Sequence, residues 1–357
     1  PDMHEIQRRR TRGTAVIERE ITEPASLTLP NGKLNRDAVG WMRQPLLDTS
    51  GIGRGWRWGR NKRWEYWNVI TPTHILALTV SSIDYAAVHE VWVFDRASEQ
   101  VWGKTISAIG GTATLPGSLE QGPSRARAKG LAIDIDEHGS EYGIEPGGTR
   151  GTRLRAAIEG ASFDVFAALP EGHERLGVVV PWSETLFQYT VKDVARPASG
   201  TVTIDRETFA VPAGQSWAVL DHGRGRWPYD IAWNWGGGSG ISHGRTIGLQ
   251  VGARWTTGTG STENSFLVDG RLHKISEELT WRYDLANWRE PWRITGGGLD
   301  AVFTPFYNKH SSTDLVIVAS RTDQCFGYWS GTFVDAAGTS IPFENIVGFA
   351  EDVHNRW

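Results

Sequence analysis

The chain has 357 residues, a formal net charge of -4 at pH 7, one cysteine and 18 tryptophans. This length is enough for two domains, or for one large β structure, with real hydrophobic cores. The lone Cys325 excludes an intrachain disulfide and a zinc site built from thiolates. The slightly acidic charge argues against nucleic acid as a partner, because nucleic-acid-binding proteins ordinarily carry a basic face.

No run of the sequence approaches the roughly 20 apolar residues of a membrane-spanning helix, and the first residues lack the apolar core of a signal peptide. We therefore expect a cytoplasmic protein without a membrane span. Nothing in the composition favours one oligomeric state over another.

Short runs of alternating or β-branched residues, broken by Gly, Asp, Asn and Pro about every ten residues, indicate antiparallel strands. The expected strands are 64–71, 74–82, 89–94, 131–136, 151–161, 161–168, 177–181, 200–204, 248–252, 265–268, 279–283, 314–319 and 328–334. Helical periodicity is scarce. So many strands without crossover helices favour closed barrels or sandwiches, because closure removes exposed sheet edges.

The pattern therefore predicts an all-β fold with two barrel-like domains. Residues 1–37 are interpreted as an N-terminal extension, 38–197 as the first barrel and 198–357 as the second. The boundary is placed at the small, turn-rich stretch 197–200, which separates two strand-rich halves.

Residues 220–264 concentrate the residue types that a buried active site needs. Acids, a histidine, arginines and large aromatics recur there, separated by glycines that let the backbone turn or approach a ligand. Tryptophans that line a barrel make a pocket for a polyene, a terpenoid, a steroid or a sugar ring. We therefore expect most of the site in the second half of the chain.

Acid-initiated chemistry needs a carboxylic acid kept neutral near pH 7, aromatic faces that stabilise a carbocation, and a base. Asp221 and Glu263 are the candidate acids, and His222 and Tyr229 are the candidate proton partners. In the alternative interpretation Asp221 pairs with Arg224 or Arg226 and Glu263 caps a turn.

The candidate substrate-binding residues are aromatic or offer hydrogen bonds to a ligand. They are Arg63, Tyr66, Trp67, Trp227, Trp233, Asn234, Trp235, Asn264 and His273. The glycine run 236–240 lacks the Lys-Ser/Thr ending of a phosphate-binding loop, so we expect a mobile loop at the mouth of the pocket.

Signals for a metal ion are weak. The ten histidines are dispersed, and no HExxH motif is present. Residues 134–139 with Glu145 match the spacing of a calcium loop, but their flanks are strand-like, so we expect a plain hairpin. We predict no metal site.

With these residues laid out, the chain resembles a bacterial and fungal family known as domain of unknown function 2804. The resembling segments are 29–35, 40–41, 62–67, 84–85, 221–229, 233–235, 262–264, 269–274, 291–292, 324–327 and 348–351. They extend in order over nearly the whole chain. More remotely, that family is similar to a calycin-like group that contains carotenoid hydratases, tocopherol cyclases and certain fungal pericyclases.

The resemblance implies a tandem pair of lipocalin-like antiparallel β-barrel domains, with a ligand pocket in one barrel or between the halves. It also implies acid-initiated or shape-guided reactions on long apolar substrates without an organic cofactor. Fold analogy alone does not determine function.

Three functions remain open from the sequence. The first is a cofactor-independent enzyme, of hydratase, cyclase or isomerase type, that uses general acid catalysis on an apolar or terpenoid-like small molecule. The second is a noncatalytic carrier of a hydrophobic ligand. The third is a glycoside hydrolase in which Asp221 and Glu263 form the paired carboxylates.

Overall fold

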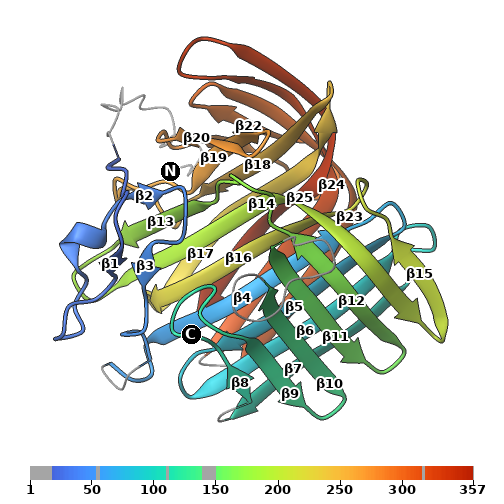
Figure 1. Cartoon of the computed structure of the whole chain (residues 1–357), viewed down its shortest axis with the longest axis horizontal. Helices are drawn as coiled ribbons and strands as arrows, with labels where there is room; N and C mark the ends of the chain where they lie inside the picture. Colours follow the sequence, from blue (N-terminus) through green and yellow to red (C-terminus); the bar gives the residue numbers. More distant parts are fainter. Residues whose placement is uncertain (1–17, 54–56, 110–111, 139–149, 316–317, 357) are drawn as a thin grey trace.

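The computed structural model describes residues 18–53, 57–109, 112–138, 150–315 and 318–356. These residues form 25 β-strands and one short 3-10 helix, η2 (Arg36–Ala38). Two large antiparallel sheets, which Figure 1 shows as two curled layers, contain nearly all of the strands. The predicted all-β class with tandem barrel-like sheets is confirmed.

The first sheet has 14 strands, and its main path runs β7-β6-β5-β4-β16-β14-β12-β11-β10-β9-β8. Its strands are β2 (Trp41–Met42), β4 (Asn61–Ile70), β5 (His74–Ser82), β6 (Ala86–Asp95), β7 (Val101–Ile109), β8 (Ala113–Thr114), β9 (Ser124–Ala128), β10 (Leu131–His138), β11 (Gly151–Ile158), β12 (Ala161–Ala168), β13 (Leu176–Pro181), β14 (Phe187–Ile204), β15 (Glu207–Val211) and β16 (Trp217–Arg226). Leu76 on β5 and Ile133 on β10 share one buried core. Because these strands lie far apart in the sheet, the sheet must curl until its halves face each other.

The second sheet has nine strands in the order β20-β19-β18-β17-β25-β24-β23-β22-β21. Its strands are β17 (Asp230–Ser242), β18 (Arg245–Ala253), β19 (Asn264–Val268), β20 (Arg271–Ile275), β21 (Thr280–Arg282), β22 (Trp292–Gly296), β23 (Leu299–Leu315), β24 (Val318–Val334) and β25 (Ser340–Arg356). Its own core contains Phe266, Phe303 and Trp329. A separate two-stranded sheet pairs β1 (Ala25–Ser26) with β3 (Leu47–Asp48).

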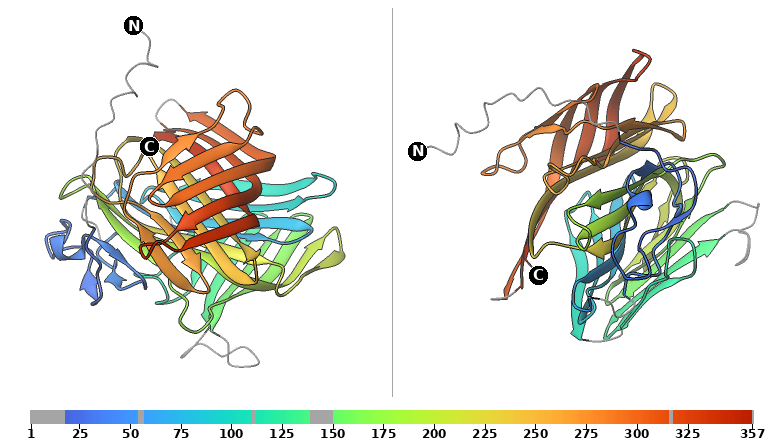
Figure 2. Two further views of the ribbon diagram at one scale, coloured as in Figure 1. Left: turned by 90° about the horizontal axis from the view of Figure 1, so that it is seen from above. Right: turned by 90° about the vertical axis from the view of Figure 1, so that its left-hand side faces the viewer.

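A third core lies between the two large sheets. Trp92 and Trp217 from the first sheet share it with Trp235, Phe326 and Phe349 from the second. In the right-hand view of Figure 2, the orange and red strands of the second sheet form a layer beside the blue and green strands of the first. The outer face of each curled sheet is therefore partly buried against the other.

The change from one sheet to the other occurs between Arg226, where β16 ends, and Asp230, where β17 begins. The predicted boundary between residues 197 and 198 falls inside β14. A division of the chain by sheets thus places the boundary later than the turn-rich stretch suggested. The described part of the predicted N-terminal extension contacts both sheets: Leu27 and Leu34 belong to the core of the first sheet, and Glu18 Oε2 lies 2.6 Å from Nζ of Lys274 on the second.

Two local predictions are wrong. The expected strand 314–319 spans a chain reversal, because Leu315 at the end of β23 pairs with Val318 at the start of β24; residues 316–317 lie outside the described part. The glycine run 236–240 is a buried part of β17 rather than a mobile loop. A side chain at Gly236 or Gly238 would collide with the ring of Trp329, so only glycine lets β17 approach it.

The described residues contain no helix that is long and apolar enough to cross a membrane.

Candidate functional site

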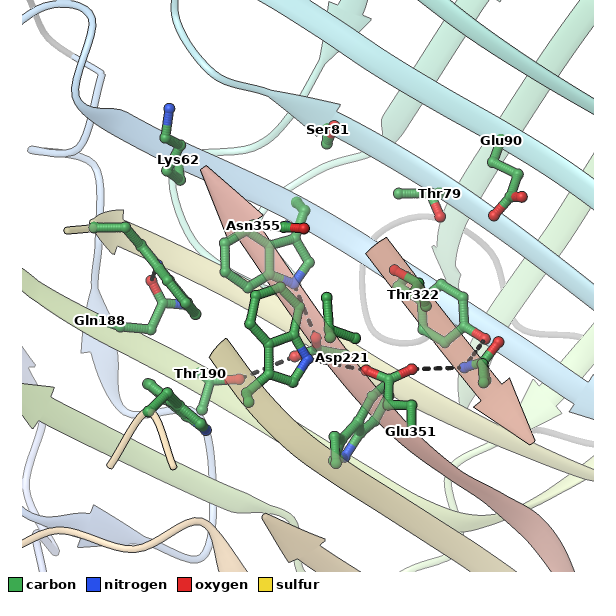
Figure 3. Close-up of a pocket in the computed structure, with 18 of the residues that line it drawn as sticks. Lys62, Thr79, Ser81, Glu90, Gln188, Thr190, Asp221, Thr322, Glu351 and Asn355 are labelled. Atoms are coloured by element: carbon green, nitrogen blue, oxygen red, sulfur yellow. Dashed lines mark hydrogen bonds between the residues drawn. The ribbon is translucent and has the colours of Figure 1, made fainter. Parts of the chain in front are cut away.

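A cavity of about 310 Å³ lies between the two sheets, with side chains from both in its wall (Figure 3). This volume is at the lower end of the roughly 300–1,000 Å³ of small-molecule sites. Strands β4, β5, β6, β14 and β16 contribute one wall, and β17, β23, β24 and β25 contribute the other. The cavity is therefore completed only by the packing of sheet on sheet.

Antiparallel register places the polar side chains of the first sheet in one row. Lys192 on β14 is opposite Asp221 on β16, and Asp221 is opposite Tyr66 on β4. Side chains of directly paired residues point to the same face of a sheet. The next row toward Gln188 holds Thr190, Gly223 and Trp64.

The second sheet presents a matching row. Trp235 on β17 pairs with Glu351 on β25, Glu351 with Gln324 on β24, and Gln324 with Lys309 on β23. The two rows touch. Lys192 Nζ lies 4.1 Å from the centroid of the Trp235 ring, and Gln324 Nε2 donates to the Tyr66 hydroxyl at 3.2 Å.

Lys192 is the ionic centre of the cavity. Its Nζ lies 2.9 Å from Oδ1 of Asp221 and 3.4 Å from Oε2 of Glu263. Burial lowers the pKa of Lys192, but attraction to the two carboxylates outweighs it and holds this pKa above its ordinary value. Lys192 is therefore a cation that holds two acids together.

Three acids of the cavity wall, Asp221, Glu263 and Glu351, each accept a hydrogen bond from an indole. Trp64 Nε1 donates to Asp221 Oδ2 at 3.0 Å, Trp255 Nε1 to Glu263 Oε1 at 2.5 Å, and Trp233 Nε1 to Glu351 Oε1 at 3.0 Å. An indole N–H only donates, and it brings a large apolar ring with it. The arrangement therefore fixes the acids in place while keeping their surroundings apolar.

Glu351 differs from the other two acids because its direct partners are neutral. Besides the Trp233 indole, Gln324 Nε2 donates to its Oε2 at 3.0 Å. Burial raises the pKa of Glu351 to about 7, although the bond from Trp233 and the charge of Lys192 act in the opposite direction. Burial also raises the pKa of Glu263, against the pull of the Lys192 ammonium.

The aromatic wall is continuous. The Trp227 ring lies edge-on to Trp64 and Trp233, with centroids 5.6 and 5.7 Å apart, and stacks on Trp255 at 5.4 Å. Indole faces at these positions carry the negative side of the ring quadrupole. The cavity can therefore receive an apolar molecule and stabilise positive charge on it.

Seven of the residues proposed from the sequence line this cavity. They are Asp221, Glu263, Arg63, Tyr66, Trp227, Trp233 and Trp235. The alternative interpretation had Asp221 paired with Arg224 or Arg226 and Glu263 capping a turn. In the structure both carboxylates instead lie next to the ammonium group of Lys192.

The other six lie elsewhere. His222 and Trp67 are neighbours in sequence of cavity residues, so strand alternation turns them into the first sheet's interior. There His222 Nδ1 lies 3.7 Å from Glu65 Oε1, and burial lowers the pKa of His222 to about 4. Tyr229 is 44% exposed, outside the cavity lining.

The remaining three residues of the prediction belong to the second sheet and have structural partners. Asn234 donates to the Tyr283 hydroxyl at 2.9 Å, and Asn264 accepts from the backbone N–H of Gly252 at 2.7 Å. The His273 ring packs edge-on against Phe333. Their assignment to substrate binding has no support from the geometry.

Sequence reasoning missed several residues of the cavity wall. They are Gln188, Thr190, Lys192, Trp255, Gln324 and Glu351. A signal existed for Lys192 and Glu351, because each belongs to a charged pair flanked by apolar residues, Val191-Lys192-Asp193-Val194 and Ala350-Glu351-Asp352-Val353. Buried charges in such segments are rare unless they are paired or functional.

Within the described residues no group of three or more His, Cys, Asp or Glu side chains is arranged to hold a metal ion. Asp134 and Asp136, two of the residues that match the spacing of a calcium loop, form ion pairs with arginines, among them Arg127 and Arg155. Residues 139–149, which include Glu145, lie outside the described part.

The fold is similar to those of solved structures at low sequence identity. Kievitone hydratase from Nectria haematococca has a similar structure with 10% identity and a TM-score of 0.48, covering 84% of this chain and 89% of that one. CghA is similar at 10% identity and a TM-score of 0.48, covering 84% and 88%. No curated protein matches the chain in sequence. The model of one family matches residues 18–357, and the chain therefore belongs to the domain of unknown function family DUF2804.

Proposed function

We propose that this protein is a cofactor-independent enzyme that protonates an apolar or terpenoid-like substrate in a hydratase, cyclase or isomerase reaction. The observation that carries the proposal is the environment of Glu351. Its carboxyl group has a pKa of about 7, and it lies in an indole-lined cavity with neutral hydrogen-bond partners. A general acid works best when its pKa is near the operating pH.

The proposed reaction begins with transfer of the Glu351 proton to a carbon of a substrate double bond, which leaves a carbocation and the Glu351 carboxylate. The faces of Trp227 and Trp233 stabilise this cation, each by about 2 kcal/mol when the site is desolvated. In a hydratase, water adds to the cation and loses a proton. In a cyclase, a second double bond attacks the cation and the cyclised cation then loses a proton; in an isomerase, a carbon next to the cation loses its proton.

We assign the proton acceptor of the last step to the carboxylate of Asp221. The Lys192 ammonium holds Asp221 at 2.9 Å, and Thr190 Oγ1 donates to the same oxygen at 3.0 Å. Lys192 therefore positions the base and balances its charge. After each turnover Asp221 releases its proton to solvent and Glu351 takes one up from solvent, so the cycle needs no cofactor.

The carrier function uses the same cavity and is the second candidate. It is favoured by the indole bonds, which give each of the three acids one hydrogen-bond donor, since a site built only to bind also needs partners for its carboxyl groups. Glycoside hydrolysis has weaker support. Lys192 contacts both Asp221 and Glu263, whereas a glycosidase leaves the space between its two carboxylates for the sugar.

The test begins with mass spectrometry of small molecules that copurify with the protein, followed by turnover assays on those molecules. Glu351→Gln should lower turnover by about 100-fold or more while affinity changes little, because glutamine keeps nearly the same shape but has no acidic proton to transfer. Glu90→Gln is the matched control, since Glu90 lines the same cavity but forms an ion pair with Lys309 at 2.9 Å. Full turnover in Glu351→Gln would overturn the assignment.

A carrier responds differently. Its bound molecule is recovered unchanged with every variant, and Trp233→Ala weakens binding by roughly 2 kcal/mol through lost apolar area. Recovery of a sugar instead of an apolar molecule would contradict both readings.

A further inference from the structure

Gln188 on β14 is fully buried and lines the cavity wall, where Figure 3 shows it. The Trp227 indole Nε1 donates to Gln188 Oε1 at 2.7 Å. Because an indole N–H cannot accept, this bond determines which way the amide faces. The oxygen of Gln188 must point to Trp227, and the NH₂ group must point away from it.

The amide nitrogen is left without a partner. Among the described residues, no atom accepts a hydrogen bond from Gln188 Nε2. A buried N–H group without a partner is costly, and more than nine in ten buried polar groups have one. A donor in this position on a cavity wall is suited to an oxygen on a bound molecule.

A second glutamine in the same surroundings shows the contrast. Gln250 on β18 also accepts from an indole, that of Trp235 at 2.8 Å. Its Nε2, however, donates to the backbone carbonyl of Glu263 at 3.1 Å, and Gln250 is not part of the cavity wall. Outside the cavity wall, the amide NH₂ of Gln250 thus has a hydrogen-bond acceptor within the protein. On the cavity wall, the amide NH₂ of Gln188 has none among the described residues.

The strand register places Gln188 at a defined separation from the acids. Gln188 and Lys192 lie four residues apart on β14, and both face the cavity. At a rise of about 3.3 Å per residue this separation is roughly 13 Å along the strand. Gly225, directly opposite Gln188 on β16, adds no side chain to the wall between Gln188 and Lys62.

We propose that Gln188 binds a carbonyl or hydroxyl oxygen at one end of an elongated, otherwise apolar substrate, whose other end lies at the row of acids. This inference rests on the proposed function and narrows its substrate class to terpenoids with a terminal oxygen. Trp227 acts through Gln188 as a positioning residue, because its N–H orients the amide.

The test is equilibrium binding followed by quenching of the cavity tryptophans, with two terpenoid probes that differ in one oxygen. Farnesylacetone carries a terminal ketone, which only accepts hydrogen bonds, and farnesene is a hydrocarbon. One neutral hydrogen bond should make the ketone bind roughly 2- to 12-fold more tightly than the hydrocarbon. Gln188→Met should remove this preference while retaining farnesene binding, and Gln250→Met is the matched control that should keep it.

Gln188→Glu, assayed at alkaline pH where its carboxyl group is ionised, serves as a second variant, because it preserves an acceptor for Trp227 and removes the donor. It should also lose the preference for the ketone, and circular dichroism of both variants checks that the sheets are intact. Equal binding of the two probes by the unmodified protein, or an unchanged preference in both Gln188 variants, would overturn the inference alone. If neither probe binds, both the role of Gln188 and the proposed apolar-substrate function are wrong. Turnover by Glu351→Gln tests the proposed function separately, because Glu351 does not determine whether the ketone binds more tightly than the hydrocarbon.

Discussion

Replacement of Glu351 by glutamine should change how the stability of the protein depends on pH, whether or not a substrate is known. Glutamine has nearly the same shape as glutamic acid, can retain the hydrogen bond from Trp233, and has no proton to lose. Any pH dependence that arises from Glu351 should therefore disappear in the variant.

The size of the effect follows from the two pKa values. Glu351 has an ordinary pKa of 4.5 in the unfolded chain and a pKa of about 7 in the folded protein, because burial disfavours its charged form. Between these values the folded protein binds more protons than the unfolded chain, so the free energy of unfolding falls as the pH rises. The stabilisation is complete below about pH 4.5, is lost as the pH passes about 7, and amounts to about 3 kcal/mol.

The measurement is urea-induced unfolding, followed by tryptophan fluorescence, at about pH 5 and about pH 8. Relative to the unmodified protein, Glu351→Gln should gain about 2.5 kcal/mol in the free energy of unfolding over this interval. The control is Glu207→Gln, at an exposed residue on β15, which should retain the pH dependence of the unmodified protein. If Glu351→Gln also retains it, Glu351 is not a neutral buried acid in the folded state.

Two further predictions concern the packing of the site. Lys192→Met should lower the free energy of unfolding by about 3–5 kcal/mol at neutral pH, because it leaves two buried carboxylates without their cation; a urea titration that shows less than about 1 kcal/mol would contradict the role of Lys192. Gly223→Ala places a methyl group against the Trp64 ring and should cost about 1–3 kcal/mol. Gly240→Ala, whose added methyl group would lie 3.2 Å from its nearest neighbour, should cost less, and equal losses in thermal unfolding would refute the argument from close contact.

The strands were predictable because their sequence signal is local. The expected strand 161–168 is β12 with the same bounds, and 74–82 is β5. What the local pattern does not determine is which face of a strand meets the other sheet. Asp221 and His222 are adjacent and both polar, yet only Asp221 faces the cavity. Adjacent residues of a strand point to opposite faces of the sheet, and the packing of the two sheets determines which face of β16 meets β17 and β25.

The site was predictable only in part, for the same reason. Residues 221–263 supply two of the acids, and their clustering in sequence made them visible. Glu351 reaches the cavity from the last strand, since β25 pairs with β17 across most of the second sheet. Lys192 enters from β14 of the first sheet. Their proximity arises from contacts between residues far apart in the chain, which single-sequence patterns do not encode.

The central claim is that Glu351 delivers a proton to carbon inside the cavity between the sheets. The most direct measurement is incorporation of deuterium into an oxygen-bearing terpenoid, followed by mass spectrometry after incubation with the protein in deuterated water. The protein should form carbon–deuterium bonds, and Glu351→Gln should form them about 100-fold more slowly with unchanged ligand affinity. Equal rates of incorporation by the protein and by Glu351→Gln would contradict the claim.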